Sequence, residues 1–98
     1  MLRRVVVLAF DGCQSLDVTG PLEVFATAAA HERSSGDEYY AVRLVSLDGR
    51  VVQSESGFGL VPKCSMAEAE REGIDTLVVA GGVGARRVAQ QADVVARV

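Results

Sequence analysis

The chain of 98 residues is long enough for one small domain, and with 49% hydrophobic residues it can build a core. Its net charge of -3 argues against binding of nucleic acid or an anionic membrane by this segment, because phosphate-binding surfaces need clustered Lys and Arg. Cys13 and Cys64 lack CxxC spacing, and the lone His31 adds no metal-ligand cluster, so we expect free thiols, no metal and no cofactor. The apolar run before Asp11 is too short for a signal peptide or a membrane span, which favours a cytoplasmic protein.

The first expected element is a strand. Val5 to Phe10 is a continuous apolar run, rich in β-branched residues and closed by Asp11-Gly12, which predicts a strand buried on both faces of a parallel sheet. Ser15 is suited to cap a helix that we expect to run to about Ala30. We expect the buried face of this helix to consist of Leu16, Gly20, Val24 and Thr27, widened by Leu22, Phe25 and Ala29.

Shorter elements follow the polar segment HERSSGDE, which we expect to be a loop. Tyr40 to Leu47 alternates in hydrophobicity and predicts a second strand, ended by another Asp-Gly turn. Residues 51–53 and 59–61 are short apolar stretches that could pair as an antiparallel appendage. Ser65 to Glu72 predicts a helix, because Ser65 and Glu68 have the spacing of a capping box.

Asp75 to Ala80 predicts another buried strand, which ends at Gly81-Gly82 before short helices expected over 84–90 and 92–98. Strands that alternate with helices predict an α/β domain with a parallel sheet. The last strand would lie near the middle of a larger sheet, so stopping at Val98 would leave an apolar sheet edge open. We therefore expect residues 1–98 to be part of a domain that further chain, or a partner chain, completes.

Two strand ends carry the candidate chemistry, because ligands bind at the carboxyl ends of parallel strands. If the first and last strands are neighbours, Asp17 and the Gly81-Gly82 backbone face the same crevice. The two glycines could present N–H groups to an anion or a developing oxyanion, or they could simply form a tight strand-to-helix turn. The dinucleotide-binding fingerprint fails, because Arg87 stands where its third glycine would be.

The residues around Asp17 also have structural alternatives. A carboxylate at Asp17 suits the positive end of a helix, and Glu23 suits a solvated helix surface. Gly20 would allow close packing of the helix on the sheet, and Pro21 is tolerated near a first turn. Cys13 is a nucleophile in principle, but the neighbouring carboxylates disfavour a reactive thiolate, so a structural role is the simpler reading.

Two segments together resemble a known superfamily. RVVVLAFDGCQSLDVTGPLEVF and DTLVVAGGVGARR are similar to the class I glutamine amidotransferase-like superfamily, in its ThiJ/PfpI branch. Within that branch they resemble most the N-terminal domain of AraC-type transcriptional regulators, and isonitrile hydratase is also similar. The resemblance implies a flavodoxin-like parallel sheet sandwiched by helices, of which this chain would hold the N-terminal half.

The resemblance also implies roles by position. Asp17 matches an acid that faces a nucleophilic cysteine, and Gly81 and Gly82 match the turn whose backbone N–H groups form part of an oxyanion site. The family's cysteine lies on an elbow after the next strand, and the DNA-binding helices lie later still, so both would lie beyond Val98. The family signature D-x-x-G-P-x-E-V-F is matched further by the structural residues Gly20, Pro21 and Glu23.

We therefore expect the N-terminal part of a ligand-sensing or dimerisation domain of an AraC-type transcriptional regulator, which is not catalytic by itself. Its expected partners are a small-molecule ligand and a second copy of the chain, with no membrane, and with DNA bound only through the absent C-terminal helices. The alternative is a fragment of a cysteine-dependent ThiJ/PfpI enzyme, such as an isonitrile hydratase or an amidase. A third reading is a half-domain that dimerises through its open sheet edge.

Overall fold

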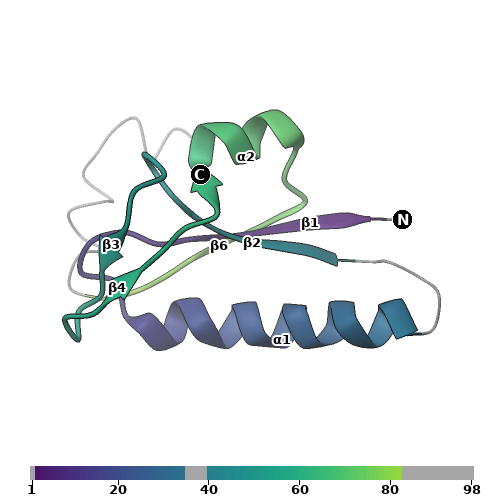
Figure 1. Ribbon diagram of the computed structural model, residues 1–98, viewed down its shortest axis with the longest axis horizontal. Coiled ribbons are helices and arrows are strands. Elements are labelled where there is room, and N and C mark those ends of the chain that lie inside the picture. Colours follow the sequence, from purple (N-terminus) through teal and green to yellow (C-terminus); the bar gives the residue numbers. More distant parts are fainter. Residues whose placement is uncertain (1, 35–39, 83–98) are drawn as a thin grey trace.

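The computed structural model describes residues 2–34 and 40–82. Within these residues the chain forms three layers, with a parallel sheet between two helices (Figure 1). The sheet has the strand order β5-β2-β1-β6, and each neighbouring pair is parallel. Its strands are β1 (Arg3–Leu8), β2 (Tyr40–Ser46), β5 (Cys64–Ser65) and β6 (Thr76–Val79). The predicted α/β domain with a parallel sheet is confirmed.

Strand β1 forms the centre of the sheet. It pairs with β2 on one side and with β6 on the other, so that Val5 lies opposite both Val42 and Thr76. Residues 5–10 are at most 4% exposed. The predicted strand with two buried faces is thus confirmed, although regular pairing ends at Leu8. The two faces build separate cores, since Val7 belongs to the cluster on one side and Val6 to the cluster on the other.

Helix α1 (Ser15–Ser34) covers one face of the sheet and extends beyond the expected end at Ala30. Its buried side contains Val18 and Ala29, with Leu22 packed against the same cluster. Four residues expected on the buried side are exposed instead: Leu16, Gly20, Val24 and Thr27. Leu22 and Ala29 were thus expected correctly on the buried side. The stripe through Leu16 was wrong, because successive helical residues turn by about 100°, which puts Leu16 and Val18 on nearly opposite sides.

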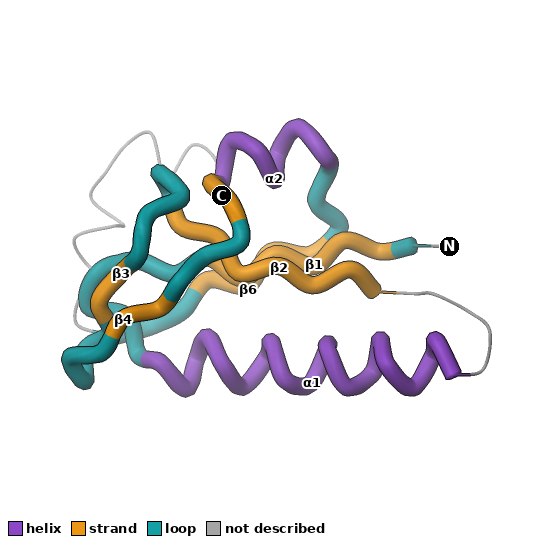
Figure 2. Tube along the Cα trace, in the orientation of Figure 1, coloured by secondary structure: helices purple, strands orange, loops and turns teal. Residues whose placement is uncertain are grey.

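A small appendage lies beyond the carboxyl ends of the sheet strands, near the start of α1 (Figure 2). It consists of β3 (Val52–Gln53) and β4 (Gly59–Leu60), which pair antiparallel as the sequence suggested. Val52 and Leu60 are directly opposite each other in this pair, and both contact the core cluster on the α1 side. The appendage is therefore packed against the domain and does not hang free of it.

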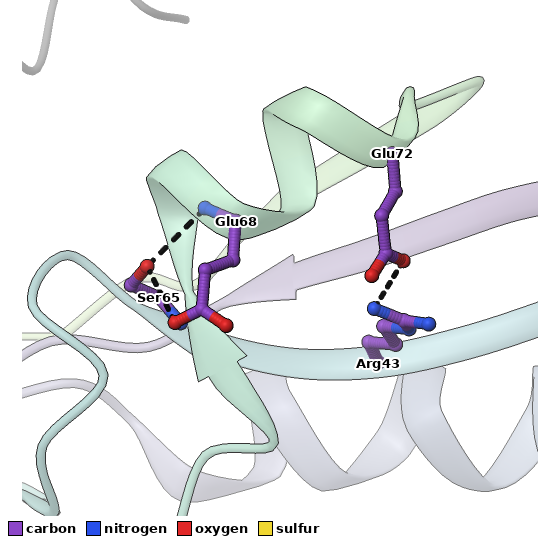
Figure 3. Close-up of polar contacts among 4 residues, drawn as sticks. All are labelled: Arg43, Ser65, Glu68 and Glu72. Carbon is purple, nitrogen blue, oxygen red and sulfur yellow. Dashed lines mark hydrogen bonds and ion pairs between the residues drawn. The ribbon is translucent and has the colours of Figure 1, made fainter.

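Helix α2 (Met66–Glu72) covers the other face, and its predicted capping box is confirmed. The Ser65 hydroxyl accepts the Glu68 backbone N–H at 3.2 Å and lies 3.1 Å from the Glu68 carboxylate (Figure 3). At the other end of the helix, Glu72 forms an ion pair with Arg43 of β2, and this hydrogen bond raises the pKa of the Arg43 guanidinium. Both ends of α2 are thus tied to the strands beneath it.

Some of the elements expected from the sequence lie partly or wholly outside the described residues. The helices expected over 84–90 and 92–98 lie outside these residues. The polar loop expected over 31–38 was wrong in its first half, because residues 31–34 form the last turn of α1, and its second half lies outside the described residues. In the part that is described, β6 pairs with β1 on one side only, so it is the edge strand there. No helix in residues 2–34 and 40–82 is long and apolar enough to cross a membrane.

Candidate functional site

The candidate site lies at the carboxyl end of the central strand, where β1 passes into α1. After β1 ends at Leu8, the chain makes a tight turn in which the Cys13 N–H donates to the Phe10 carbonyl at 3.0 Å. It then enters the helix, where the Asp17 N–H donates to the Gln14 carbonyl at 3.0 Å. These local bonds place the Asp17 carboxylate in the first turn of α1, facing the end of β6.

Asp17 and Gly81 are in direct contact, although 64 positions separate them in the sequence. The Gly81 N–H donates to Oδ2 of Asp17 at 3.0 Å, and the Gly81 carbonyl accepts the Gln14 N–H at 2.7 Å. Both polar groups of the Gly81 backbone are therefore committed to the β1–α1 connection. The strands β1 and β6 are neighbours in the sheet, and their pairing brings Asp17 next to the glycine turn.

Close approach of the loops requires a glycine at position 82, whereas at Gly81 the nearest atom is the end of a side chain. A Cβ on Gly81 would lie 2.8 Å from Asp17 Oδ2. Gly82 has a φ of +121°, and a Cβ there would lie 2.5 Å from both the Gln14 nitrogen and the Gly12 carbonyl oxygen. The tight-turn alternative thus accounts for Gly82 without a ligand. The role of the two glycines in binding an anion or an oxyanion stays a prediction.

The same β1–α1 connection also holds the β3–β4 appendage. The Asp11 carboxylate accepts the Gln53 N–H at 2.9 Å, and the Gln53 carbonyl accepts the Gly12 N–H at 2.8 Å. A third bond runs from the Glu55 N–H to the Cys13 carbonyl at 2.7 Å. Asp11 and Gln14 are positioning residues that were not predicted from the sequence. The available signal was the Asp-Gly pair directly after a buried strand, which marks a turn at the ligand-binding edge.

The two cysteines are free and lie in different parts of the fold. Cys13 has 0% exposure and belongs to the core cluster on the α1 side, together with Phe10 and Val18. Cys64 is half-buried in β5 and packs against the cluster on the α2 side. Neither of these environments is that of an accessible nucleophile. Among the described residues, no group of three or more His, Cys, Asp or Glu side chains could hold a metal ion.

The three signature residues of α1 lie further along the helix. Gly20 and Glu23 are exposed, and Pro21 is half-buried inside the helix. A Cβ on Gly20 would meet no described atom within 4 Å. Close packing of α1 on the sheet is therefore not what requires this glycine. The described contacts do not bring these three residues to the Asp17–Gly81 pair.

Comparison with known proteins places this geometry in a family. The model of the DJ-1/PfpI family matches residues 3–98, which is nearly the whole chain. The chain belongs to the DJ-1/PfpI family. The resemblance to the ThiJ/PfpI branch that the sequence indicated is thereby confirmed. The four-stranded parallel sheet flanked by helices corresponds to the flavodoxin-like arrangement of its structural neighbours.

Three relatives illustrate the similarity. A Streptomyces lividans protein, described as an uncharacterized protein in the cpoL 5′ region, is 48% identical over 79 residues, which are 81% of this chain and 51% of that protein. DJ-1beta of Drosophila melanogaster has a TM-score of 0.68 and 18% identity, over 97% of this chain and 46% of its own. An AraC family transcriptional regulator from Pseudomonas putida has a TM-score of 0.66 and 28% identity, over 83% of this chain and 41% of its own. The chain thus spans about half the length of the relatives it matches.

Proposed function

We propose that this chain forms the N-terminal part of a ligand-sensing α/β domain of an AraC-type transcriptional regulator, and that it is not catalytic by itself. The observation that carries the proposal is the similarity to the Pseudomonas putida regulator, with 28% identity over 83% of this chain. The net charge of -3 agrees with a segment that senses a ligand and leaves contacts with DNA to other parts of a regulator.

The geometry of the site supports binding in preference to turnover. An oxyanion site needs donors that are aimed at the developing charge. The Gly81 N–H instead donates to the Asp17 carboxylate of the same chain, so this donor is already occupied. Cys13, the thiol next to the site in sequence, is fully buried in the core.

The Asp17 side chain indicates the class of ligand. Its carboxylate is exposed and uses Oδ2 for the Gly81 N–H, and a carboxylate can accept further hydrogen bonds. Such a group binds molecules that carry N–H or O–H donors, and it repels anions. The proposed ligand is therefore a small amide, amine or alcohol, and not a carboxylate or a phosphate.

Nuclear magnetic resonance of the labelled chain tests this proposal, with acetamide, methylammonium and acetate as probes. We expect acetamide and methylammonium to shift the backbone amide signals of Gly81 and Gln14, while acetate leaves them unchanged. Asp17→Asn should remove the response to methylammonium. Glu23→Gln, which changes an exposed acid further along α1, should retain it. A response to acetate alone would contradict the proposed ligand class and favour an anion site.

The alternative is a fragment of a cysteine-dependent enzyme such as an isonitrile hydratase or an amidase. It is supported by membership of the DJ-1/PfpI family and by the position of Asp17 at the carboxyl edge of the sheet. The nucleophile would then come from a segment outside the described residues. Turnover of an isonitrile or an amide by the purified chain, lost in Asp17→Asn, would establish the enzyme and rule out the non-catalytic role.

A further inference from the structure

A small pocket lies at the amino end of the sheet, at the opposite end of the strands from the Asp17–Gly81 pair. It lies between the strands β1 and β2 and the last turn of α2, and its volume is about 190 Å³, part of which is open to solvent. The pocket has a charged part and an apolar part. Its charged lining residues are Arg4, Arg43 and Glu72, and its apolar side chains include Val6, Ala41 and Ala69.

The alternation of side chains along the strands brings the two arginines to the same face of the sheet. Alternate residues of a strand point to the same face. Val6 and Val45 belong to the core on the α2 side. Arg4 lies two residues before Val6, and Arg43 lies two residues before Val45, so both arginines are on the α2 side. Ala41 is paired with Arg4 across the two strands, which makes Arg4 and Arg43 diagonal neighbours.

The charged side chains of the pocket do not balance one another. Glu72 forms an ion pair with Arg43, and the two side chains point toward each other between α2 and β2 (Figure 3). Within residues 2–34 and 40–82, no carboxylate forms an ion pair with the Arg4 guanidinium. The Asp75 carboxylate accepts the Arg4 backbone N–H at 2.7 Å, but it does not line the pocket. Two guanidinium groups thus meet one carboxylate in the pocket lining, which favours an anion with a single negative charge.

We propose that this pocket binds a small aliphatic monocarboxylate, with the Arg4 guanidinium as the principal donor. A guanidinium group can donate two parallel hydrogen bonds to a planar carboxylate. The apolar side chains of the pocket then contact the aliphatic part of the ligand. A phosphate dianion fits less well, because the Glu72 carboxylate repels its second charge. The site is separate from the Asp17–Gly81 pair and does not depend on the proposed ligand-sensing role.

Titration of the labelled chain with butyrate, followed by nuclear magnetic resonance, tests this site. We expect saturable shifts of the Ala41 and Ala69 backbone amide signals, with a dissociation constant of about 1–10 mM, as for a small ligand with few contacts. Butyramide has a similar shape without the charge and should leave these two signals unchanged. Inorganic phosphate should bind at least about threefold more weakly than butyrate, because of the repulsion by Glu72.

Two substitutions in the pocket should have opposite effects on the dissociation constant of butyrate. Arg4→Gln removes the principal donor from an exposed position and should raise the constant by about tenfold or more. Glu72→Gln removes the competing carboxylate and releases Arg43, so it should lower the constant by about twofold to fivefold. The matched control is Arg3→Gln, which removes the neighbouring exposed arginine on the opposite face of the sheet and should change the constant by less than about twofold.

Three results would overturn the proposal. One is the absence of saturable shifts up to about 50 mM butyrate. Another is an equal response to butyramide, which would show apolar contact without recognition of the carboxylate. The third is an equal loss of affinity in Arg3→Gln and Arg4→Gln, which would show a general attraction of anions to this end of the chain. Circular dichroism of each variant verifies that it is folded.

A peptide arm separates the two sources of an aliphatic carboxylate, which are a free acid and the C-terminus of a peptide. The probe is acetylated alanyl-valine with a free carboxyl group, and its C-terminal amide is the control that should not bind. Tighter binding of this peptide than of butyrate would identify a peptide C-terminus as the ligand, and weaker binding would identify a free acid. Either result supports the carboxylate site.

Discussion

Gly82 occupies a position where two loops approach more closely than a side chain permits. Its φ is +121°, and a Cβ would meet the Gln14 nitrogen and the Gly12 carbonyl oxygen at 2.5 Å. Both contacts are with backbone, which cannot swing aside as a flexible side chain can. We expect Gly82→Ala to lower the free energy of unfolding by about 2 kcal/mol or more, measured by urea denaturation.

Gly57→Ala separates the two causes of that loss. Gly57 also has a positive φ, of +93°, but a Cβ there would meet no atom within 4 Å. Gly57→Ala introduces backbone strain without a steric clash of the new Cβ, and we expect it to lower the free energy of unfolding by about 1 kcal/mol. Equal losses in Gly57→Ala and Gly82→Ala would show that the loops can move apart, and that their contact at Gly82 is not rigid.

The bond between Asp17 and Gly81 gives a second prediction at the scale of single residues. Asp17→Ala removes the only acceptor that the structure describes for the Gly81 N–H, whereas Asp17→Asn keeps an oxygen in place. We expect hydrogen exchange of the Gly81 amide to accelerate about tenfold in the alanine variant, which corresponds to the loss of roughly 1.4 kcal/mol, and less in the asparagine variant. Glu23→Ala is the control, because this exposed acid lies further along α1, and there the Gly81 exchange rate should not change.

At the scale of elements, the start of α2 is held by its own capping box. The Ser65 hydroxyl accepts the Glu68 backbone N–H, and the Glu68 carboxylate accepts the Ser65 backbone N–H. We expect Ser65→Ala to reduce the free energy of unfolding by about 1 kcal/mol in urea denaturation. Ser56→Ala, in the exposed turn between β3 and β4, should change it by less than about 0.5 kcal/mol. A Ser65→Ala variant as stable as the wild type would mean that tertiary packing alone fixes the helix start.

The elements also differ in how far the sequence could predict them. The capping box and the strand β2 depend on residues that are neighbours in the chain, so both were predicted correctly. The face of α1 was predicted only in part: Leu22 and Ala29 are on the buried side as expected, but the stripe through Leu16 and Val24 is exposed. Apolar residues lie on both sides of this helix, and periodicity alone does not say which side meets the sheet. Strand β5 was missed, since its two residues become a strand only by pairing with β2.

At the scale of the whole molecule, the sheet separates two hydrophobic cores, one on each of its faces. Met66 is 1% exposed in the core on the α2 side, where it packs with Val6, Leu8 and Val45. We expect Met66→Ala to destabilise the protein by roughly 2–4 kcal/mol, through lost burial and the cavity that remains. Val61→Ala, at an exposed position, should cost less than about 0.5 kcal/mol in the same urea denaturation. Similar values for both would contradict a close-packed core around Met66.

The candidate site was predictable only in outline. The sequence indicated that Asp17 and Gly81 would face one crevice if their strands were neighbours, because both residues follow the carboxyl ends of parallel strands. The pairing of β1 with β6 that meets this condition was not itself predicted. The bonds that hold the β3–β4 appendage could not be predicted, since Asp11 and Gln53 are 42 positions apart and no periodicity links them. The hydrogen bond from the Gly81 N–H to Asp17 could not be predicted either, because it depends on loop geometry and not on residue type.

The central place of β1 has a consequence for the synthesis of the protein. Its first neighbour, β2, ends at Ser46, and its second neighbour, β6, ends at Val79, which is 33 residues later (79 - 46). At roughly 5–20 residues per second, a ribosome needs about 2–7 s to make that stretch. During this interval one edge of a very apolar strand has no partner in the nascent chain. Chaperones that bind extended apolar segments therefore have a defined time window in which to act on β1.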